Sequence, residues 1–311
     1  MSEMWVQMVM GKEHTVISTF AGCGGSSLGY KWAGFKELLA IDYEKNAVET
    51  FKLNFDSPIW QRDIKTVTGN EILKFCEIKK GELDILDGSP PCQGFSTAGK
   101  QKVTDSRNNL FLEYVRLINE LEPKVFIMEN VTGMMKGKFK GKFNEILGTL
   151  RGTGYNIKCK LMNAKYYEVP QSRERLIFIG VRGDIRVGPV YPVAQGKLIT
   201  VKNVDKNDRK RAKYSNIRYG DVMLKRNRPC QTITKISRYF YNEQNLYGIE
   251  SLKAFQSFPD NFNMTGSFQN KKERIGNSVP PKMMYHIAKT VREEILDKMD
   301  SKNNNPPRAR A

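Results

Sequence analysis

The side chain with the clearest chemical potential is Cys92, in the segment GSPPCQGFS that spans residues 88–96. Two consecutive prolines stop the apolar segment before it and restrict the backbone, because proline neither continues a helix nor pairs inside a sheet. A thiolate is the nucleophilic form of cysteine, and a rigid loop would aim it at a substrate. The segment therefore predicts a nucleophilic cysteine, whereas most single cysteines are small buried side chains.

Two further segments carry side chains suited to proton transfer or charge stabilisation. Glu129 ends an apolar run in IMENV (127–131), where partial loss of solvent would suit it to proton donation. An ion-paired or helix-capping glutamate is the alternative. Arg173 and Arg175 lie two residues apart in QSRERLIFIG, so strand geometry would place both on one face, where they could bind a carboxylate, a phosphate or a carbonyl oxygen. An ordinary exposed edge is the alternative for this pair.

A glycine-rich turn, FAGCGGSSLG (20–29), follows the first expected strand and opens a helix. Gly22, Gly24 and Gly25 would let a ligand approach the backbone, and the helix N-terminus presents free N–H groups. Asp42 ends the second expected strand about 20 residues later, where a carboxylate could bind ribose hydroxyls. The turn predicts a site for a nucleoside-bearing cofactor. A dinucleotide-dependent dehydrogenase and a purely structural turn remain as alternatives.

A second rigid segment, ERIGNSVPP (273–281), leads into an expected helix near the C-terminus. Its Asn277 and Ser278 could bind a small ligand or cap that helix. The sequence alone leaves both uses open.

Alternating strand and helix patterns would position these residues. Strands are expected at 14–20, 37–42, 82–88, 124–130 and 175–182, and helices at 26–34, 44–55, 108–123 and 143–154. The alternation predicts a Rossmann-like α/β domain with a mostly parallel sheet and helices on both faces. Ligands of such folds bind at the carboxyl ends of the strands, so Cys92 is expected beside whatever the glycine-rich turn holds.

The pattern changes after about Gly183. Residues 183–227 contain eleven Lys or Arg and four Asp, a net charge of +7, with weak periodicity. We expect a large domain over 1–183, a small domain of loops and short strands over 184–262, and a return to the large domain over 263–298. Helical patterns return at 250–258 and 280–296, and the polar, proline-containing tail 299–311 is expected to be disordered.

Composition narrows the function classes. The net charge of +18 over 311 residues favours a polyanionic partner such as nucleic acid. Five widely spaced cysteines and two histidines indicate neither a disulfide framework nor a zinc site. No apolar run approaches the roughly 20 residues of a membrane helix, and the N-terminus lacks the pattern of a secretion signal. The expectation is a soluble intracellular protein.

Eight segments together resemble, in order, the motif set of the cytosine-5 DNA methyltransferases of the bacterial or phage, restriction-modification-like type. They are FAGCGG, AIDYE, QRDI, GSPPCQGFS, MENV, QSRERLIFIG, RPCQTIT and ERIGNSVPP, and they span residues 16 to about 289. The combination of the Pro-Cys-Gln, Glu-Asn-Val and Gln-x-Arg-x-Arg segments is specific to this family. The dehydrogenase alternative leaves these three segments unexplained.

The resemblance implies a role for each matched position. The residues expected to surround the cofactor S-adenosylmethionine are Phe20, Ala21, Gly22, Gly24, Gly25, Asp42, Tyr43, Asp63, Ile64, Pro90, Asn277 and Ser278. The implied catalytic residues are Cys92 as nucleophile and Glu129, Arg173 and Arg175 around the target cytosine. The candidate DNA-binding residues are Gln93, Ser96, Arg209, Lys210, Arg211, Lys213, Lys235 and Tyr239.

The resemblance also implies the reaction and its partners. Cys92 would attack carbon 6 of a cytosine flipped out of double-stranded DNA, and carbon 5 would receive the methyl group, leaving S-adenosylhomocysteine. No metal and no membrane are expected, the chain would act as a monomer, and a cognate restriction endonuclease would be a genetic rather than a physical partner. The bacterial cytosol or nucleoid, or a virus-infected cell, is the expected location.

Two departures from the family pattern and two rival functions accompany this hypothesis. Ser18 stands where many members carry an acid, and the stretch between QSRERLIFIGVR and RPCQTIT is short for the family. An RNA cytosine methyltransferase of the tRNA-modifying branch is one rival, although that branch carries a Cys-Phe-Thr segment that this sequence lacks. A non-enzymatic DNA-binding relic is the other, although relics usually lose the nucleophile or the cofactor loop.

Overall fold

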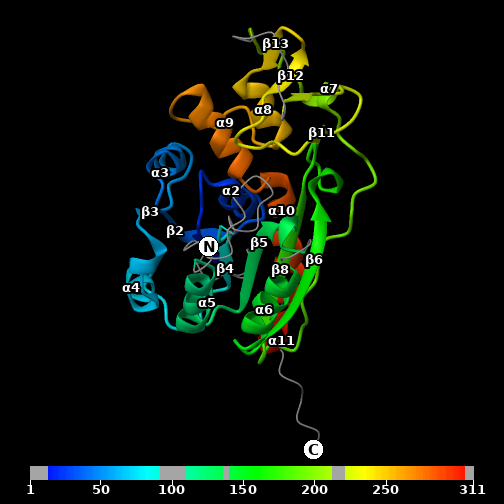
Figure 1. Cartoon of the computed structure of the whole chain (residues 1–311). Coiled ribbons are helices and arrows are strands. Elements are labelled where there is room, and N and C mark those ends of the chain that lie inside the picture. Colours follow the sequence, from blue (N-terminus) through cyan, green and yellow to red (C-terminus); the bar gives the residue numbers. More distant parts are fainter. Residues whose placement is uncertain (1–12, 92–109, 136–139, 212–220, 305–311) are drawn as a thin grey trace, which may run out of the picture.

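A seven-stranded sheet forms the centre of the larger part of the molecule. The computed structural model describes residues 13–91, 110–135, 140–211 and 221–304. The sheet has the spatial order β3-β2-β1-β4-β5-β8-β6 (Figure 1). Its strands are β1 (Thr15–Thr19), β2 (Lys36–Asp42), β3 (Ile59–Gln61), β4 (Ile85–Gly88), β5 (Val125–Val131), β6 (Tyr155–Asn163) and β8 (Glu174–Arg182). From β3 to β5 all neighbours are parallel, and β8 runs antiparallel to β5 and β6. The predicted, mostly parallel sheet is confirmed.

Helices cover both faces of this sheet, because successive strand residues point to opposite sides. Within β4, Leu86 joins the core that also contains α5, whereas Ile85 joins the core that contains α2 and α10. The first face is covered by α4 (Gly69–Phe75), α5 (Leu110–Leu121) and α6 (Lys140–Arg151), and the second by α2 (Gly25–Trp32) and α10 (Pro281–Val291). Burial on both faces explains why the central strands are apolar without alternation.

Sequence patterns missed two strands of the sheet, both at its edges. β3 has only three residues, and β6 alternates partly buried and exposed positions with lysines on its outer side. An edge strand has one neighbour and more solvent, so its sequence lacks the continuous apolar run that marks a central strand. Helix α3 (Lys45–Lys52), by contrast, was expected and packs beside β2 and β3.

A second, smaller sheet lies at one end of the molecule, where β12 and β13 are labelled in Figure 1. It contains β9 (Arg209–Arg211), β10 (Val222–Met223), β12 (Tyr239–Asn242) and β13 (Asn245–Tyr247) in the order β10-β12-β13-β9. It shares a core with α7 (Val201–Val204), α8 (Ile249–Phe255) and α9 (Phe268–Asn277). A two-stranded ladder of β7 (Gln171–Ser172) and β11 (Cys230–Gln231) joins this region to the start of β8.

The C-terminal helix continues further than the sequence predicted. After α10 the chain forms a π-helix over Arg292–Leu296 and then α11 (Asp297–Asn304). The expected disorder from residue 299 is therefore wrong for residues 299–304. No proline or glycine interrupts the helix before Pro306, and Asp297 at its start lies 2.8 Å from Nε2 of the buried His14. Within the described ranges no helix is long and apolar enough to cross a membrane.

Candidate active site

The loop that leads to Cys92 is anchored at the carboxyl end of β5. Asn130 donates from Nδ2 to the carbonyl oxygen of the buried Pro90, at 3.2 Å. This bond joins the end of β5 to the chain that leaves β4, two residues before the cysteine. Cys92, Gln93 and Ser96 themselves lie outside the described residues.

Glu129, next to this anchor, forms a buried ion pair with Arg175. Arg175 Nε lies 2.7 Å from Glu129 Oε1, and the two side chains are 13% and 10% exposed. The pair bridges the antiparallel strands β5 and β8, where Val131 is the register partner of Arg175. The ion-paired alternative from the sequence therefore holds, and its partner is an arginine of the same motif set. The attraction between the two charges keeps the carboxyl group at the strand end, although Arg175 Nε makes no hydrogen bond to the residues that the structure describes.

Arg173 has different partners from Arg175. The strand is interrupted at Arg173, because β7 ends at Ser172 and β8 begins at Glu174. The guanidinium group of Arg173 is buried and donates from Nη1 to the carbonyl oxygens of Ile233 at 3.2 Å and Gly276 at 2.9 Å. Burial, followed by the charge of Arg175, lowers the pKa of Arg173 to about 9. Arg173 thus joins three distant segments of the chain, which spacing along one strand does not predict.

The glycine-rich turn adopts a backbone that few side chains tolerate. Phe20 has φ +54° and Gly22 has φ +57°, both in the left-handed region. A Cβ at Gly22 would meet nothing within 4 Å, so the space above this residue is open. A Cβ at Gly25 would overlap the carbonyl oxygen of Val279, so α2 begins directly against the segment after α9. The buried Ala21 donates from N to the carbonyl oxygen of Ile41 at 3.1 Å.

Asp42 binds this turn from the end of β2. Its Oδ2 accepts from Gly22 N at 2.8 Å, and its Oδ1 accepts from Glu44 N at 2.9 Å. Burial raises the pKa of Asp42 to about 6, against the opposing effects of the Gly22 amide and of Arg274. The carboxylate is therefore held at the mouth of the turn by backbone amides.

The next expected cofactor residues follow Asp42 along the same edge. Tyr43 is 71% exposed, so its ring is accessible to a ligand. Asp63 is also exposed, and its Oδ1 accepts from Lys65 N at 3.0 Å, while Ile64 is buried. Glu44, after Tyr43, forms an ion pair with Arg274 of α9.

Asn277 and Ser278 reach the same place from the other end of the chain. Ser278 Oγ lies 3.1 Å from Cys23 Sγ in the glycine-rich turn, and Ser278 accepts at its carbonyl oxygen from Gln256 Nε2 at 2.6 Å. Asn277 is exposed at the end of α9. No side chain caps α10, whose N-cap is Pro280, so the capping alternative is wrong. Burial raises the pKa of Cys23 to about 11, which keeps this contact a neutral thiol.

The departure at Ser18 has a counterpart on the neighbouring strand. Ser18 of β1 and Asp87 of β4 are register partners, and both are buried. Tyr30 donates its hydroxyl to Asp87 Oδ1 at 3.1 Å, and burial raises the pKa of Asp87 to about 8. A carboxyl group is thus present under α2 despite the serine. Sequence patterns missed it because Asp87 is an isolated acid inside an apolar strand.

The described site suits a nucleoside-bearing cofactor. It combines an open space above Gly22, an exposed aromatic ring at Tyr43, and carboxylates at Asp42 and Asp63 that could accept from ribose hydroxyls or an adenine amino group. Among the residues that the structure describes, no group of three or more His, Cys, Asp or Glu could hold a metal ion.

Two of the expected DNA-binding residues serve the small domain internally. Arg209 donates to both oxygens of Asp205 at 2.9 and 2.7 Å, and its guanidinium group stacks on Tyr241 and Tyr247 at 4.1 and 4.7 Å from the ring centroids. Tyr239 is buried and donates to the carbonyl oxygen of Thr232 at 3.1 Å. The basic composition of residues 183–227 predicted a DNA-binding region. It did not predict which of the cations there form ion pairs within the protein.

Other cations of this region face solvent. Lys210 is exposed beside Phe268, and Lys235 is exposed at 4.0 Å from Glu273. Arg226, which the sequence did not single out, is 45% exposed and lies 3.6 Å from Asp205. For Arg211 only the backbone pairing with Asn245 is described, and Lys213 lies outside the described residues.

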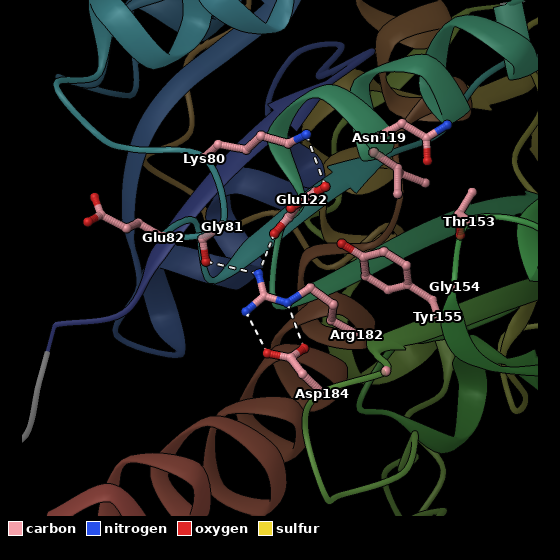
Figure 2. Close-up of a pocket in the computed structure, with 12 residues that line it drawn as sticks. Lys80, Gly81, Glu82, Asn119, Glu122, Thr153, Gly154, Tyr155, Arg182 and Asp184 are labelled. Atoms are coloured by element: carbon pink, nitrogen blue, oxygen red, sulfur yellow. Dashed lines mark hydrogen bonds and ion pairs between the residues drawn. The ribbon is translucent and has the colours of Figure 1, made fainter.

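A hollow of about 680 Å³ at the opposite end of the large sheet is not part of this site (Figure 2). Arg182 donates there to Asp184 at 2.8 and 3.1 Å and to the carbonyl oxygens of Gly81 and Glu122, and Lys80 pairs with Glu122 at 3.0 Å. The charged side chains bind one another, so they are satisfied without a ligand.

Comparison with known families identifies the family of the chain. The sequence model of the family described as C-5 cytosine-specific DNA methylase matches residues 14–249 and 199–293. The chain belongs to this family. As a C-5 cytosine-specific DNA methylase it carries DNA (cytosine-5)-methyltransferase activity. This confirms the activity predicted from the sequence.

Similar proteins include bacterial methyltransferases that match most of this chain. The type II methyltransferase M.FnuDI of Fusobacterium nucleatum is 30% identical over 91% of this chain and 95% of the relative. M1.HphI of Haemophilus parahaemolyticus is 34% identical over 89% and 86%. A putative DNA modification methyltransferase of an E. coli prophage has a similar fold, with a TM-score of 0.75, 24% identity, and 91% of this chain and 99% of that chain covered.

Proposed function

We propose that this methyltransferase converts cytosine to 5-methylcytosine, at a short duplex sequence, through a covalent adduct with Cys92. The observation that carries the proposal is the buried Glu129–Arg175 ion pair beside the Asn130–Pro90 hydrogen bond. Together they hold a carboxyl group and a guanidinium group at the strand end from which the cysteine loop is anchored.

The proposed chemistry uses these groups in a fixed order. The Cys92 thiolate forms a sulfur–carbon bond at carbon 6, while Glu129 donates a proton or hydrogen bond to N3 of the ring. Electron density then becomes available at carbon 5, which takes the methyl group. Loss of the carbon 5 proton to water and release of the thiolate restore the double bond between carbons 5 and 6, and the N3 proton returns to Glu129. Arg175 holds Glu129 and stabilises charge on the cytosine oxygen.

When bound, S-adenosylmethionine supplies an electrophilic methyl group, and S-adenosylhomocysteine is the product. Phe20 and Gly22 would line its binding site, Tyr43 would pack on adenine, and Asp42 would accept from the ribose hydroxyls. Asp63 would bind the adenine amino group, with Ile64, Pro90, Asn277 and Ser278 completing the site. The proposed chemistry requires no metal ion.

Double-stranded DNA is the proposed substrate form, because carbon 5 and carbon 6 become accessible only when the cytosine leaves the stack. Flipping costs a few kcal/mol, which phosphate contacts of the basic region would offset. We assign this region to a small domain over 184–262, between a large domain over 1–183 and its return over 263–298. Lys210, Arg226 and Lys235 are the exposed cations that suit phosphate contacts, and Gln93 and Ser96 would lie near the target base.

The type II names of the bacterial relatives support a restriction-modification context. A cognate endonuclease would recognise the same sequence without binding this chain. We propose that the chain acts as a monomer. The bacterial cytosol is the proposed location.

Base-resolution cytosine methylation mapping tests the proposal. A methylation-free bacterial host would express the native chain or the Cys92→Ala variant. Methylation at one short sequence in the first culture and none in the second is the expected result, and it also reveals the target. Methylation that persists in the Cys92→Ala culture would refute the covalent mechanism. Methylation of tRNA but not DNA would favour the RNA-modifying alternative.

A further inference from the structure

Ile236 is an apolar side chain that is mostly exposed. It is 63% exposed, whereas Ile233, three residues earlier, is completely buried in the core of the small domain. An isoleucine left in water forgoes the burial free energy that most isoleucines gain. A partner that covers Ile236 would therefore gain this burial free energy.

The loop that carries Ile236 is held rigidly by the chain around it. Ser237 donates from N to Thr234 Oγ1 at 3.2 Å, and the Thr234 and Ser237 hydroxyls bond to each other at 3.0 Å. Gln269 Nε2 donates to the carbonyl oxygen of Lys235 at 3.0 Å, and Lys272 Nζ donates to that of Ser237 at 3.1 Å. The backbone on both sides of Ile236 is thus fixed by α9, and the side chain is presented from a preorganised support.

This loop also lies against the active site. A Cβ at Gly276 would come within 2.8 Å of the Thr234 carbonyl carbon, so the loop packs directly on the residue before Asn277. Arg173, two residues from the catalytic Arg175, donates to the carbonyl oxygen of Ile233 at 3.2 Å. The start of the loop, at Ile233 and Thr234, is therefore joined by direct contacts both to the cofactor side and to the catalytic side of the site.

One exposed cation precedes the exposed isoleucine. Lys235 is 45% exposed and lies 4.0 Å from Glu273, whereas Lys272 of α9 is buried and donates to the same loop. An apolar tip beside an exposed amine suits a surface that is negative outside and apolar inside. Duplex DNA has this character, with phosphates along its edge and stacked bases within.

We propose that Ile236 is a wedge that enters the duplex at the target base pair and stabilises the state in which the cytosine is flipped out. The role rests on the proposed function and adds a residue to it. Proteins that distort DNA insert apolar side chains between base steps, and the space left by an extruded base needs a group that preserves stacking contacts. A β-branched side chain on a fixed loop loses little conformational freedom on insertion.

Two duplexes that share the mapped target sequence separate this role from a general binding role. In the first the target cytosine is paired with guanine, and in the second it faces an abasic site, so that flipping costs less. Ile236→Ala is expected to lower kcat/KM about 10-fold or more on the paired duplex, and less than about 3-fold on the abasic duplex. Ile236→Leu is expected to keep most of the activity.

Val193→Ala is the matched control, because Val193 is 83% exposed and β-branched but lies in the segment after β8, next to residues that pack on the large domain. It should leave both rates unchanged. Fluorescence of 2-aminopurine at the target position provides a direct measure of flipping, and its increase should be smaller with Ile236→Ala than with the native chain.

Equal losses on both duplexes, or no loss on either, would overturn the wedge role while leaving the methyltransferase mechanism intact. If the native chain methylates neither duplex, the proposed function itself fails and the wedge role with it. A loss confined to the paired duplex supports the proposal.

Discussion

The buried ion pair between Glu129 and Arg175 predicts how stability responds when either partner is removed. Both side chains are about one-tenth exposed and their nearest charged atoms are 2.7 Å apart. Removing one partner of a buried pair costs about 3–5 kcal/mol, because the other charge stays desolvated without its counterion. The remaining exposure places Glu129→Leu and Arg175→Met near the lower end, at about 3 kcal/mol each. The double variant removes both charges, so we expect it to lose only about 1–2 kcal/mol.

Urea unfolding followed by tryptophan fluorescence and circular dichroism measures these free energies. With a slope of about 3 kcal/mol per molar urea, each single variant should shift the midpoint down by about 1 M. The coupling free energy of the double-mutant cycle, the two single losses less the double loss, should be about 4–5 kcal/mol. The exposed pair Lys289–Glu293, at 3.9 Å, is the control and should couple by less than about 0.5 kcal/mol. Additivity within about 0.5 kcal/mol for Glu129 and Arg175 would refute the argument.

Three further predictions concern other residues of the site. Burial raises the pKa of Asp87 from 3.8 to about 8, despite the hydrogen bond from Tyr30. The free energy of unfolding should therefore fall as pH rises from about 4 to about 8. Asp87→Asn should make this fall less steep, and an equally steep fall in the native chain and the variant would contradict the prediction. Arg173→Leu leaves two buried carbonyl oxygens without a donor, so unfolding should become about 2–4 kcal/mol easier and the KM for S-adenosylmethionine should rise; native-like values of both would count against the link. Arg226→Ala should weaken DNA binding and reduce the slope of log Kd against log salt concentration by about one unit, measured in titrations from low to physiological salt. Arg209→Ala should mainly lower thermal stability. If instead Arg209→Ala changed the salt slope and Arg226→Ala lowered stability, the assigned partners of these two arginines would be wrong.

The sequence predicted the central strands of the large sheet better than its edges. Strands β1, β4 and β5 are buried on both faces, so each contains consecutive apolar residues. The edge strand β6 alternates partly buried and exposed residues, and its lysines conceal it. Burial of both faces requires apolar residues along a strand, and an edge strand is less buried, so its sequence shows less of this pattern.

The two arginines of QSRERLIFIG show what spacing cannot predict. The strand is interrupted at Arg173. One guanidinium group pairs with Glu129, and the other binds carbonyl oxygens from residues 233 and 276. The partners of Arg173 lie about 60 and 100 residues away along the chain. Likewise, a basic cluster in the sequence contained Arg209, whose charge is already used by Asp205.

By itself, the sequence determined the class of sheet, the family, and the residue types of the turn and loops at its carboxyl edge. Those features depend on local geometry, because glycine, proline and apolar runs restrict the backbone wherever they occur. Only the tertiary structure decided that Ser278 meets Cys23, that Asp87 lies opposite Ser18, and that Ile236 stands exposed on a loop fixed by α9. Those contacts join segments that are distant along the chain, and their partners are selected by packing, which no local pattern records.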